Sequence, residues 1–238
     1  MLHINPNLTI NQKKEYLRNK NNIHNIHTLI ANYCDVYLDE ELDILLLKII
    51  NSETLLKLHM CECKVDSYFV SRITNQKLVD INFSYNFIGD KGAIHLAKIP
   101  TLRKVNLNFN YIGDTGMINI LRHKKIRILY LDDNFNITNV GLEKCYANRI
   151  KEIELGTLNV SKLGLSYLSN SNLTKIKLHF PYIGDDEFDL FNYNYNIETL
   201  NIITPLVTYN MRKKLWNRCK INKHNKKIRN DLLYQSLL

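Results

Sequence analysis

The sequence predicts an α/β solenoid with a parallel sheet on its concave side, helices on its convex side and helical caps at both ends. The main observation is that residues 78–121 contain two copies of one pattern. Each copy joins a strand-like part, with apolar residues two apart, to a part with helical spacing. The copies start 24 residues apart, at Leu78 and Leu102. Repeats of this length stack so that each buries its core against the next. Eight positions recur: Leu78, Ile81, Phe83, Asn86, Ile88, Gly89, Asp90 and Gly92 return as Leu102, Val105, Leu107, Asn110, Ile112, Gly113, Asp114 and Gly116.

The same frame extends in both directions from this pair. Two apolar residues enter the core from each strand, and the following residue, ideally Asn, turns the chain out of the strand. A Gly-Asp pair opens the helical part, and Asp90 and Asp114 are the expected helix N-caps. Repeats start at Leu55, Leu78, Leu102, Ile126, Ile150, Leu173 and Ile197, with a degenerate one near Tyr33.

The residue at the Asn position changes along the array. In chain order it is Cys63, Asn86, Asn110, Asn134, Leu158, Pro181 and Pro205. Loss of Asn in the last three repeats predicts a change of curvature or looser packing from about Leu158 onward.

The ends of the chain differ from the array, which gives one continuous structural domain of three parts. Residues 1–54 form an expected helical N-terminal cap with a degenerate first repeat, including a short strand at 36–38 and a helix at 39–50. Residues 55–208 are the repeats, and 209–238 form a basic helical C-terminal cap. That cap is expected to hold a helix at 208–219 and a closing amphipathic helix formed by Ile228, Leu232, Leu233 and Leu237.

The motif N-x-I-G-D-x-G-A-x-x-L-A at residues 86–97 resembles leucine-rich repeats of the ribonuclease-inhibitor-like class, and especially the bacterial GALA type. The resemblance covers about residues 55–207 and weakens later, where Gly184 is not followed by the second Gly. It implies a horseshoe with an Asn ladder, a protein-binding concave face and no catalytic residues. With so much Asn, Ile, Lys and Tyr, the chain is similar to effectors of AT-rich intracellular bacteria such as Legionella, which implies secretion into a host cell.

An adaptor role is the first alternative. Some GALA proteins carry an F-box that docks onto host ubiquitin ligase, and residues 38–50 resemble an F-box opening. Asp39 stands where the F-box pattern has Pro, and a capping unit of the array also explains this segment.

The expected partner-binding site lies on the strand positions that alternate with the buried ones. Aromatic side chains beside charged ones are typical of protein-binding patches. The opposing interpretation is that Glu152 and Glu154 pair with Lys175 and Lys177 on the next strand, and that Phe87, Tyr111, Phe135 and Tyr182 stack as structure. The candidate residues are Tyr85, Asn106, Phe109, Tyr130, Asp132, Asp133, Glu152, Glu154, Lys175 and Lys177.

We expect no enzyme activity, cofactor or metal. His59 and His179 lie five strands apart, and no phosphate loop or nucleophile motif appears. Five cysteines at irregular spacing indicate reduced thiols in a cytosolic environment, and the repeat frame explains Cys63 without a metal. The sequence shows no secretory signal and no membrane-spanning run.

The net charge of +9 belongs to the C-terminal segment. Residues 209–238 contain nine Lys and Arg against Asp231, a balance of +8, so the preceding residues sum to +1. The segment is a solvated helix face, a contact for an acidic partner or an anionic membrane, or a nucleic-acid contact in which Trp216 stacks. We expect a monomer whose partner is another protein.

Overall fold

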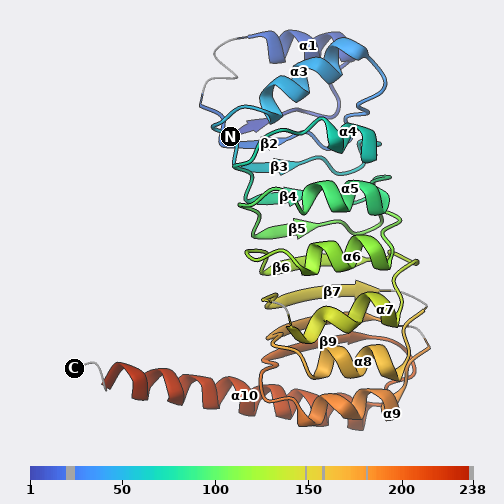
Figure 1. Ribbon diagram of the computed structural model, residues 1–238, viewed down its shortest axis with the longest axis vertical. Helices are drawn as coiled ribbons and strands as arrows, with labels where there is room; N and C mark the ends of the chain where they lie inside the picture. Colours follow the sequence, from blue (N-terminus) through green and yellow to red (C-terminus); the bar gives the residue numbers. More distant parts are fainter. Residues whose placement is uncertain (20–24, 148, 157–158, 181, 236–238) are drawn as a thin grey trace.

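The computed structural model describes residues 1–19, 25–147, 149–156, 159–180 and 182–235. Within these residues, nine parallel strands form one open sheet in the order of the sequence. Helices cover one side of the sheet, and the strands stack along the long axis of the molecule (Figure 1). The predicted α/β solenoid is confirmed.

The predicted repeat frame fixes the register of the sheet. Leu58, Ile81, Val105 and Leu129 occupy the same frame position and lie opposite one another on consecutive strands. All four are buried, because alternate side chains of a strand point to opposite faces. The strands are β1 Leu2–His3, β2 Thr28–Ile30, β3 Lys57–His59, β4 Asp80–Asn82, β5 Lys104–Asn106, β6 Ile128–Asp132, β7 Glu152–Gly156, β8 Lys175–His179 and β9 Thr199–Ile203.

The two longest helices, α3 and α10, lie toward the two ends of the chain, and the helices between them are shorter. The helical elements are α1 Ile10–Arg18, α3 Glu40–Ile50, α4 Ser67–Ser71, α5 Gly89–Leu96, α6 Asp114–Leu121, α7 Asn139–Leu142, η1 Glu143–Ala147, α8 Lys162–Ser169, α9 Asp185–Phe188, η2 Asp189–Tyr193 and α10 Tyr209–Gln235.

A ladder of buried Asn side chains joins consecutive repeats. The Asn134 Nδ2 donates to the carbonyl oxygens of Leu107 (2.8 Å) and Leu131 (3.0 Å). Its Oδ1 accepts from the N–H groups of Asn110 (3.1 Å) and Ile112 (2.8 Å). Asn86 and Asn110 bond in the same way. The ladder therefore satisfies backbone groups that would otherwise be buried without partners.

The position of the ladder Asn in each repeat is here called the ladder position. Before Asn86 and after Asn134, other residues occupy it. The Cys63 thiol donates to the carbonyl oxygen of Ala31 (2.9 Å), so it replaces one of the bonds that Asn makes. Leu158 and Pro181, the next two positions at which the sequence loses Asn, lie outside the described residues.

Two acidic residues bond to the helix of the following repeat. The expectation that Asp90 and Asp114 cap their own helices is wrong, because α5 and α6 begin without a side-chain cap. The Asp90 Oδ1 accepts from the N–H groups of Gly113 (2.7 Å) and Gly116 (2.9 Å) at the start of α6. Each carboxylate lies in the first turn of its own helix, where its side chain reaches the free N–H groups of the next one.

This bond between repeats occurs again further along the chain. The Asp114 Oδ1 accepts from the N–H groups of Thr138 (2.7 Å) and Gly141 (2.8 Å). Asn139 does the same for α8, where it accepts from Gly164 (3.0 Å). A Cβ on Gly141 would lie 2.5 Å from the Asp114 Oδ1. The second Gly of the motif is therefore required by the carboxylate of the preceding repeat.

The sheet starts earlier than the sequence predicted. Two strands, β1 and β2, precede β3, and Leu2 pairs with Leu29, which pairs with Leu58. The strand expected at residues 36–38 is wrong, since the chain there forms turns. The expected helix at 39–50 is present as α3, with Asp39 as its N-cap.

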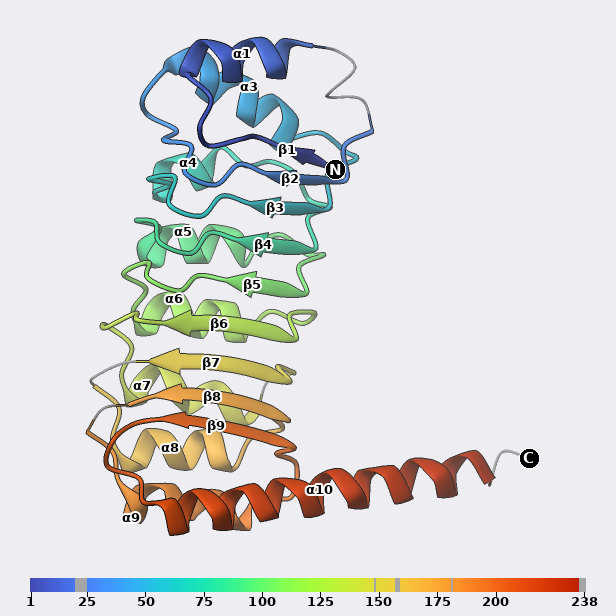
Figure 2. The same cartoon turned by 180° about the vertical axis from the view of Figure 1, so that it is seen from behind.

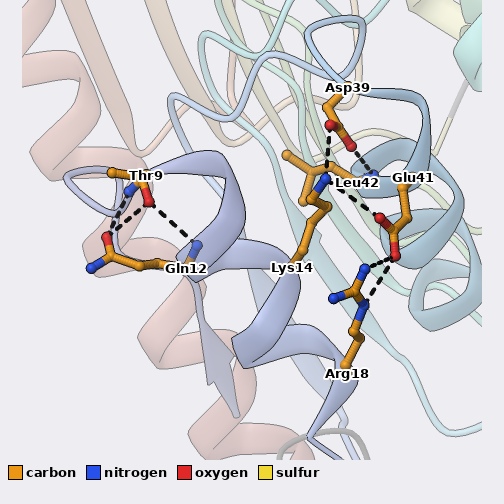
Figure 3. Close-up of polar contacts among 7 residues, drawn as sticks. All are labelled: Thr9, Gln12, Lys14, Arg18, Asp39, Glu41 and Leu42. Carbon is orange, nitrogen blue, oxygen red and sulfur yellow. Dashed lines mark hydrogen bonds and ion pairs between the residues drawn. The ribbon is translucent and has the colours of Figure 1, made fainter.

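The first two described helices are joined by ion pairs. Lys14 of α1 lies 2.9 Å from the Asp39 carboxylate and 3.4 Å from that of Glu41, and Arg18 also binds Glu41 (Figure 3). The same Asp39 accepts from the Leu42 N–H (2.9 Å), so one side chain both starts α3 and holds α1 against it.

One long helix, α10, follows the last strand. Its first part crosses the end of the array and its second part projects away from it (Figures 1 and 2). Leu215 and Cys219 are buried, and the Arg212 guanidinium donates to the carbonyl oxygens of Ile202, Thr204 and Val207. The expectation of two separate helices after residue 207 is wrong.

The C-terminal side chains that were expected to close the core are not among those that the structure describes. Leu237 lies outside the described residues, as do the side chains of Ile228, Leu232 and Leu233. In the described part of the chain, no helix is long and apolar enough to cross a bilayer.

Candidate functional site

The outward positions of strands β3 to β9 form a polar surface, here called the strand face. Its side chains lie in rows, because equivalent residues are in register on neighbouring strands. One row passes through Asp80, Lys104, Ile128 and Glu152, and the next through Asn106, Tyr130 and Glu154. The Lys104 ammonium lies 5.7 Å from the centre of the Tyr130 ring, and the Asn106 Oδ1 accepts from the Asn108 N–H.

Most acids of the strand face are paired within the sheet. The Tyr130 hydroxyl donates to Glu152 (2.6 Å), and Lys175 lies 3.5 Å from the same carboxylate. Lys177 binds Glu154 at 2.5 Å. Burial and the Glu152 carboxylate raise the pKa of Tyr130, and Glu154 raises the pKa of Lys177. The predicted cross-strand pairing is therefore confirmed, which leaves these acids little free charge to offer a partner.

Asp132 is buried, although the sequence placed it on the open surface. Its side chain is 8% exposed, and its Oδ2 lies 3.2 Å from the His179 Nδ1. It reaches His179 across Gly156, where a Cβ would lie 1.8 Å from the Asp132 Oδ1. Because Gly156 has no side chain, the Asp132 carboxylate can pack against the next strand. Its role is therefore structural.

A row of left-handed residues marks the C-terminal edge of the strand face. Glu62, Tyr85, Phe109 and Asp133 each directly precede the ladder position, and their φ angles are 54°, 58°, 55° and 53°. This backbone region favours Gly and Asn, and other residues adopt it at a cost of about 1–2 kcal/mol. The turn needs the left-handed conformation, but nothing in the backbone requires aromatic rings there. The sequence did not indicate this conformation.

Aromatic side chains from this row and its neighbours line a groove. Tyr85 stacks on Phe109 with 4.2 Å between ring centres, and the expected stacking of Phe87 on Tyr111 is confirmed at 6.0 Å. The groove has a volume of about 270 Å³. We call it the aromatic groove, lined by Tyr85, Asn86, Phe87, Phe109, Asn110, Tyr111, Asp133 and Phe135.

The rings of the aromatic groove remain open to solvent. Tyr85 is 48% exposed, Phe87 54% and Tyr111 63%. Exposed aromatic side chains that cluster over adjacent repeats form a contiguous apolar patch, and such patches mark interaction sites more often than isolated ones do.

Two carboxylates accompany these rings. Asp133 lines the groove, and Glu62 occupies the same row one repeat before Tyr85. Neither forms an ion pair with another described residue, whereas the nearby Lys64 is bound to Asp35 at 2.6 Å. Burial and the adjacent Asp132 raise the pKa of Asp133. The free negative charge thus lies beside the aromatic groove and not in the middle of the strand face.

Groups suited to metal or redox chemistry do not gather in this region. Among the described residues, no cluster of three or more His, Cys, Asp or Glu could hold a metal ion. The five cysteines are free thiols, and burial raises the pKa of Cys63 and Cys145 to about 12. His59 lies beside Asp80 (3.7 Å) and His179 beside Asp132, so the two histidines belong to different contacts.

Comparison with known families gives the type of repeat. A family model described as a leucine-rich repeat matches residues 74–97 and 98–121, the pair that repeats most regularly. The parallel sheet continues the same unit on both sides of this pair. The fold is a leucine-rich-repeat solenoid. Such scaffolds generally bind other proteins and are typically not enzymes.

Solved structures agree with this fold. The leucine-rich-repeat array is similar to a chain in the crystal structure of a TLR13–ssRNA13 complex, with a TM-score of 0.51 and 14% identity over 76% of this chain. The match spans 26% of that longer chain. At this identity, the similarity concerns the fold alone.

Two smaller structures match over most of their length. They are the leiomodin-1 actin-binding site 2 (TM-score 0.31, 10% identity, 97% of this chain and 99% of that one) and the tropomodulin C-terminal domain of Caenorhabditis elegans (0.30, 10%, 94% and 98%). These scores add nothing to the fold assignment. No curated protein matches the sequence.

Proposed function

We propose that this chain is a non-enzymatic protein-interaction module that binds one protein through the aromatic groove and the adjoining strand face. The observation that carries the proposal is the set of stacked, solvent-exposed rings beside unpaired carboxylates. Aromatic anchors surrounded by polar groups are the usual source of binding energy in protein interfaces. Of the residues expected from the sequence, Tyr85, Phe109 and Asp133 form the centre of this site. Paired residues such as Tyr130 and Glu154 form its polar margin.

We further propose that the module is a bacterial effector of GALA-like type that acts in the reducing cytosol of a host cell. The support is the repeat motif at residues 86–97, together with a composition rich in Asn, Ile, Lys and Tyr. A solenoid that lies across a partner can block the partner's active site, so inhibition is the expected mode of virulence. The adaptor alternative gains no support, because α3 buries six of its residues as the helix of a repeat.

The test is affinity capture with a variant that removes the rings and keeps the backbone. Tyr85→Asn with Phe109→Asn retains a residue type that tolerates the left-handed conformation. Loss of two central anchors should weaken binding of the captured partner at least about 30-fold, because one interface hot spot alone contributes about 2 kcal/mol or more.

The matched control is Tyr193→Asn in η2, where the tyrosine is 70% exposed and lies away from the groove. This control should bind as the wild-type chain does. If every captured protein remains bound to the groove variant as tightly as to the control, the proposed function is wrong.

A further inference from the structure

We propose that the aromatic groove recognises an extended peptide segment that carries two arginine or lysine side chains four residues apart. Glu62 and Asp133 would each bind one cation, and the stacked rings between them would contact the side chain in the middle. The inference rests on the proposed protein-binding function and specifies the chemistry of the partner.

The first step is the charge of the row. In chain order its members are Glu62, Tyr85, Phe109 and Asp133, so an acid stands on each side of the aromatic pair. Backbone bonds hold these members one repeat apart: the Tyr85 N–H donates to the Asn108 carbonyl (2.9 Å) and the Phe109 N–H to the Asp132 carbonyl (2.9 Å). Both flanking carboxylates remain available, since no ion pair within the described part of the chain involves them. A cationic partner would supply the ion-pair partner that each of these two carboxylates lacks.

The second step is the electrostatic character of the rings. Burial raises the pKa of Tyr85, and the carboxylates of Asp133 and Glu62 raise it further. The fields of both acids therefore meet at the aromatic pair, although they belong to different repeats. The faces of aromatic rings also attract cations, and Arg in particular stacks on them. Positive charge is consequently favoured at both ends of the row, and the ring faces between them accept an apolar or a cationic side chain.

The third step is the spacing. Adjacent parallel strands lie about 4.8 Å apart, so the three steps from Glu62 to Asp133 span roughly 14 Å. In an extended peptide, residues four apart lie about 13 Å from each other and point to the same side. Two basic side chains at this separation match the two acids, and the residue midway between them faces the Tyr85–Phe109 pair.

The fourth step is the cost of the aromatic residues themselves. A left-handed turn is formed more easily by Asn or Gly, as noted above, so Tyr85 and Phe109 are unfavourable for the backbone. Their mutual stacking offsets part of this cost. Contact with a ligand gives a reason for keeping both rings at positions where smaller residues fold more easily.

The experiment measures binding of a short blocked peptide by fluorescence anisotropy. The probe has arginine at two positions four residues apart, leucine midway and serine elsewhere. A second peptide has the same composition with the arginines three residues apart, so that they point to opposite sides. We expect the first peptide to bind at least about tenfold more tightly than the second, and its binding to weaken as salt is added.

The variants are near-isosteric, which keeps the fold intact. Glu62→Gln and Asp133→Asn should each weaken binding of the first peptide by about tenfold, because each removes one charge-assisted contact. The control is Asp186→Asn, an exposed acid of α9, which should have no effect. Equal binding of both peptides, or equal binding to the wild-type chain and to the Glu62→Gln, Asp133→Asn double variant, would overturn the inference.

The capture assay separates this inference from the proposed function. If the double carboxylate variant still binds the captured protein while Tyr85→Asn with Phe109→Asn does not, the function stands and the cationic partner is wrong. If neither variant alters capture, both proposals fail.

Discussion

Individual side chains of the array perform two separate tasks. The buried Asn residues connect one repeat to the next through bonds to backbone groups, and two of them, Asn86 and Asn110, also line the aromatic groove. The rings make few such connections and lie open to solvent. Stability and the proposed recognition are therefore assigned to adjacent residues, such as Asn110 and Phe109, with little overlap between them.

Replacing Asn134 tests the structural task. Asn134→Ala leaves the N–H groups of Asn110 and Ile112, and several carbonyl oxygens, without partners in a fully buried position. We expect the free energy of unfolding to fall by about 2–4 kcal/mol, because each unsatisfied buried group costs about 1–3 kcal/mol. Chemical denaturation followed by circular dichroism measures this change.

Asn119→Ala is the matched control. Asn119 lies on α6, and its side-chain amide donates to the Thr115 carbonyl in its own helix. Its loss should change stability by no more than about 0.5 kcal/mol. A similar cost for both substitutions would mean that the ladder does not stabilise the array.

At the scale of helices, α6, α7 and α8 each donate hydrogen bonds at their N-termini to a side chain of the preceding repeat. Asp114 belongs to α6 but bonds to the first N–H groups of α7, and Gly141 of α7 leaves room for it. A helix of four residues has little stability of its own. Its formation therefore depends on the repeat that precedes it.

A double-mutant cycle measures this dependence. Asp114→Ala should cost about 1–2 kcal/mol through loss of the cap, and Gly141→Ala about 1–3 kcal/mol through the clash with the carboxylate. In the double variant the clash is absent, so its cost should fall short of the sum by at least about 1 kcal/mol.

The comparison cycle combines Asp114→Ala with Gly156→Ala. A Cβ at residue 156 would meet the Asp132 carboxylate of strand β6, on the sheet and not on α7. Here the two costs should add within about 0.5 kcal/mol. Additive costs in both cycles would exclude the coupling between Asp114 and Gly141.

At the scale of the whole molecule, α10 closes the end of the sheet. Arg212 bonds to three carbonyl oxygens near the last strand, and Asn222 donates to the carbonyl oxygens of Asn194 (3.0 Å) and Ile197 (2.7 Å). Lys226 also pairs with Glu198 at 2.5 Å. An open strand edge is prone to pair with other chains, and this helix covers the edge of β9.

Truncation shows how much of α10 the array needs. A chain that ends at Lys226 keeps these contacts, and its melting temperature should stay within a few degrees of the full-length value. A chain that ends at Thr208 exposes Ile202 and Val207, and it should lose at least about 3 kcal/mol and aggregate. Thermal denaturation with light scattering measures both effects. Equal behaviour of the two shortened chains would contradict this role for α10.

The sequence predicts the regular part of the array better than its ends. Apolar residues two apart located strands β3 to β9, because the period of a buried strand is visible in any sequence. Strand β1 was missed since two residues, Leu2 and His3, show no period. Helix α10 was divided in two because the mainly polar stretch 220–227 separates two groups of apolar residues, although it contains no Pro or Gly that would end a helix.

The candidate site was predicted in composition but not in detail. Tyr85, Phe109 and Asp133 were identified from their frame position. The burial of Asp132 depends on Gly156, a residue 24 positions later, and no local pattern relates the two. The left-handed turn likewise follows from the stacking of repeats and not from local preference, since Tyr and Phe disfavour it. Glu62 was not identified because Cys63, and not Asn, follows it in the repeat frame.

The bonds between successive helices have a consequence for how such an array can lengthen. The unit that starts at Leu102 carries both halves of the contact, Asp114 for the unit after it and Gly116 for the unit before it, and the next unit carries Asn139 and Gly141. A tandem duplication of either of these whole units therefore inherits a compatible junction at once, without further substitution. An insertion whose boundaries fall within a unit would instead place the carboxylate against a side chain. In this part of the array, lengthening by a complete repeat is therefore compatible with the junction, and lengthening by part of a repeat is not.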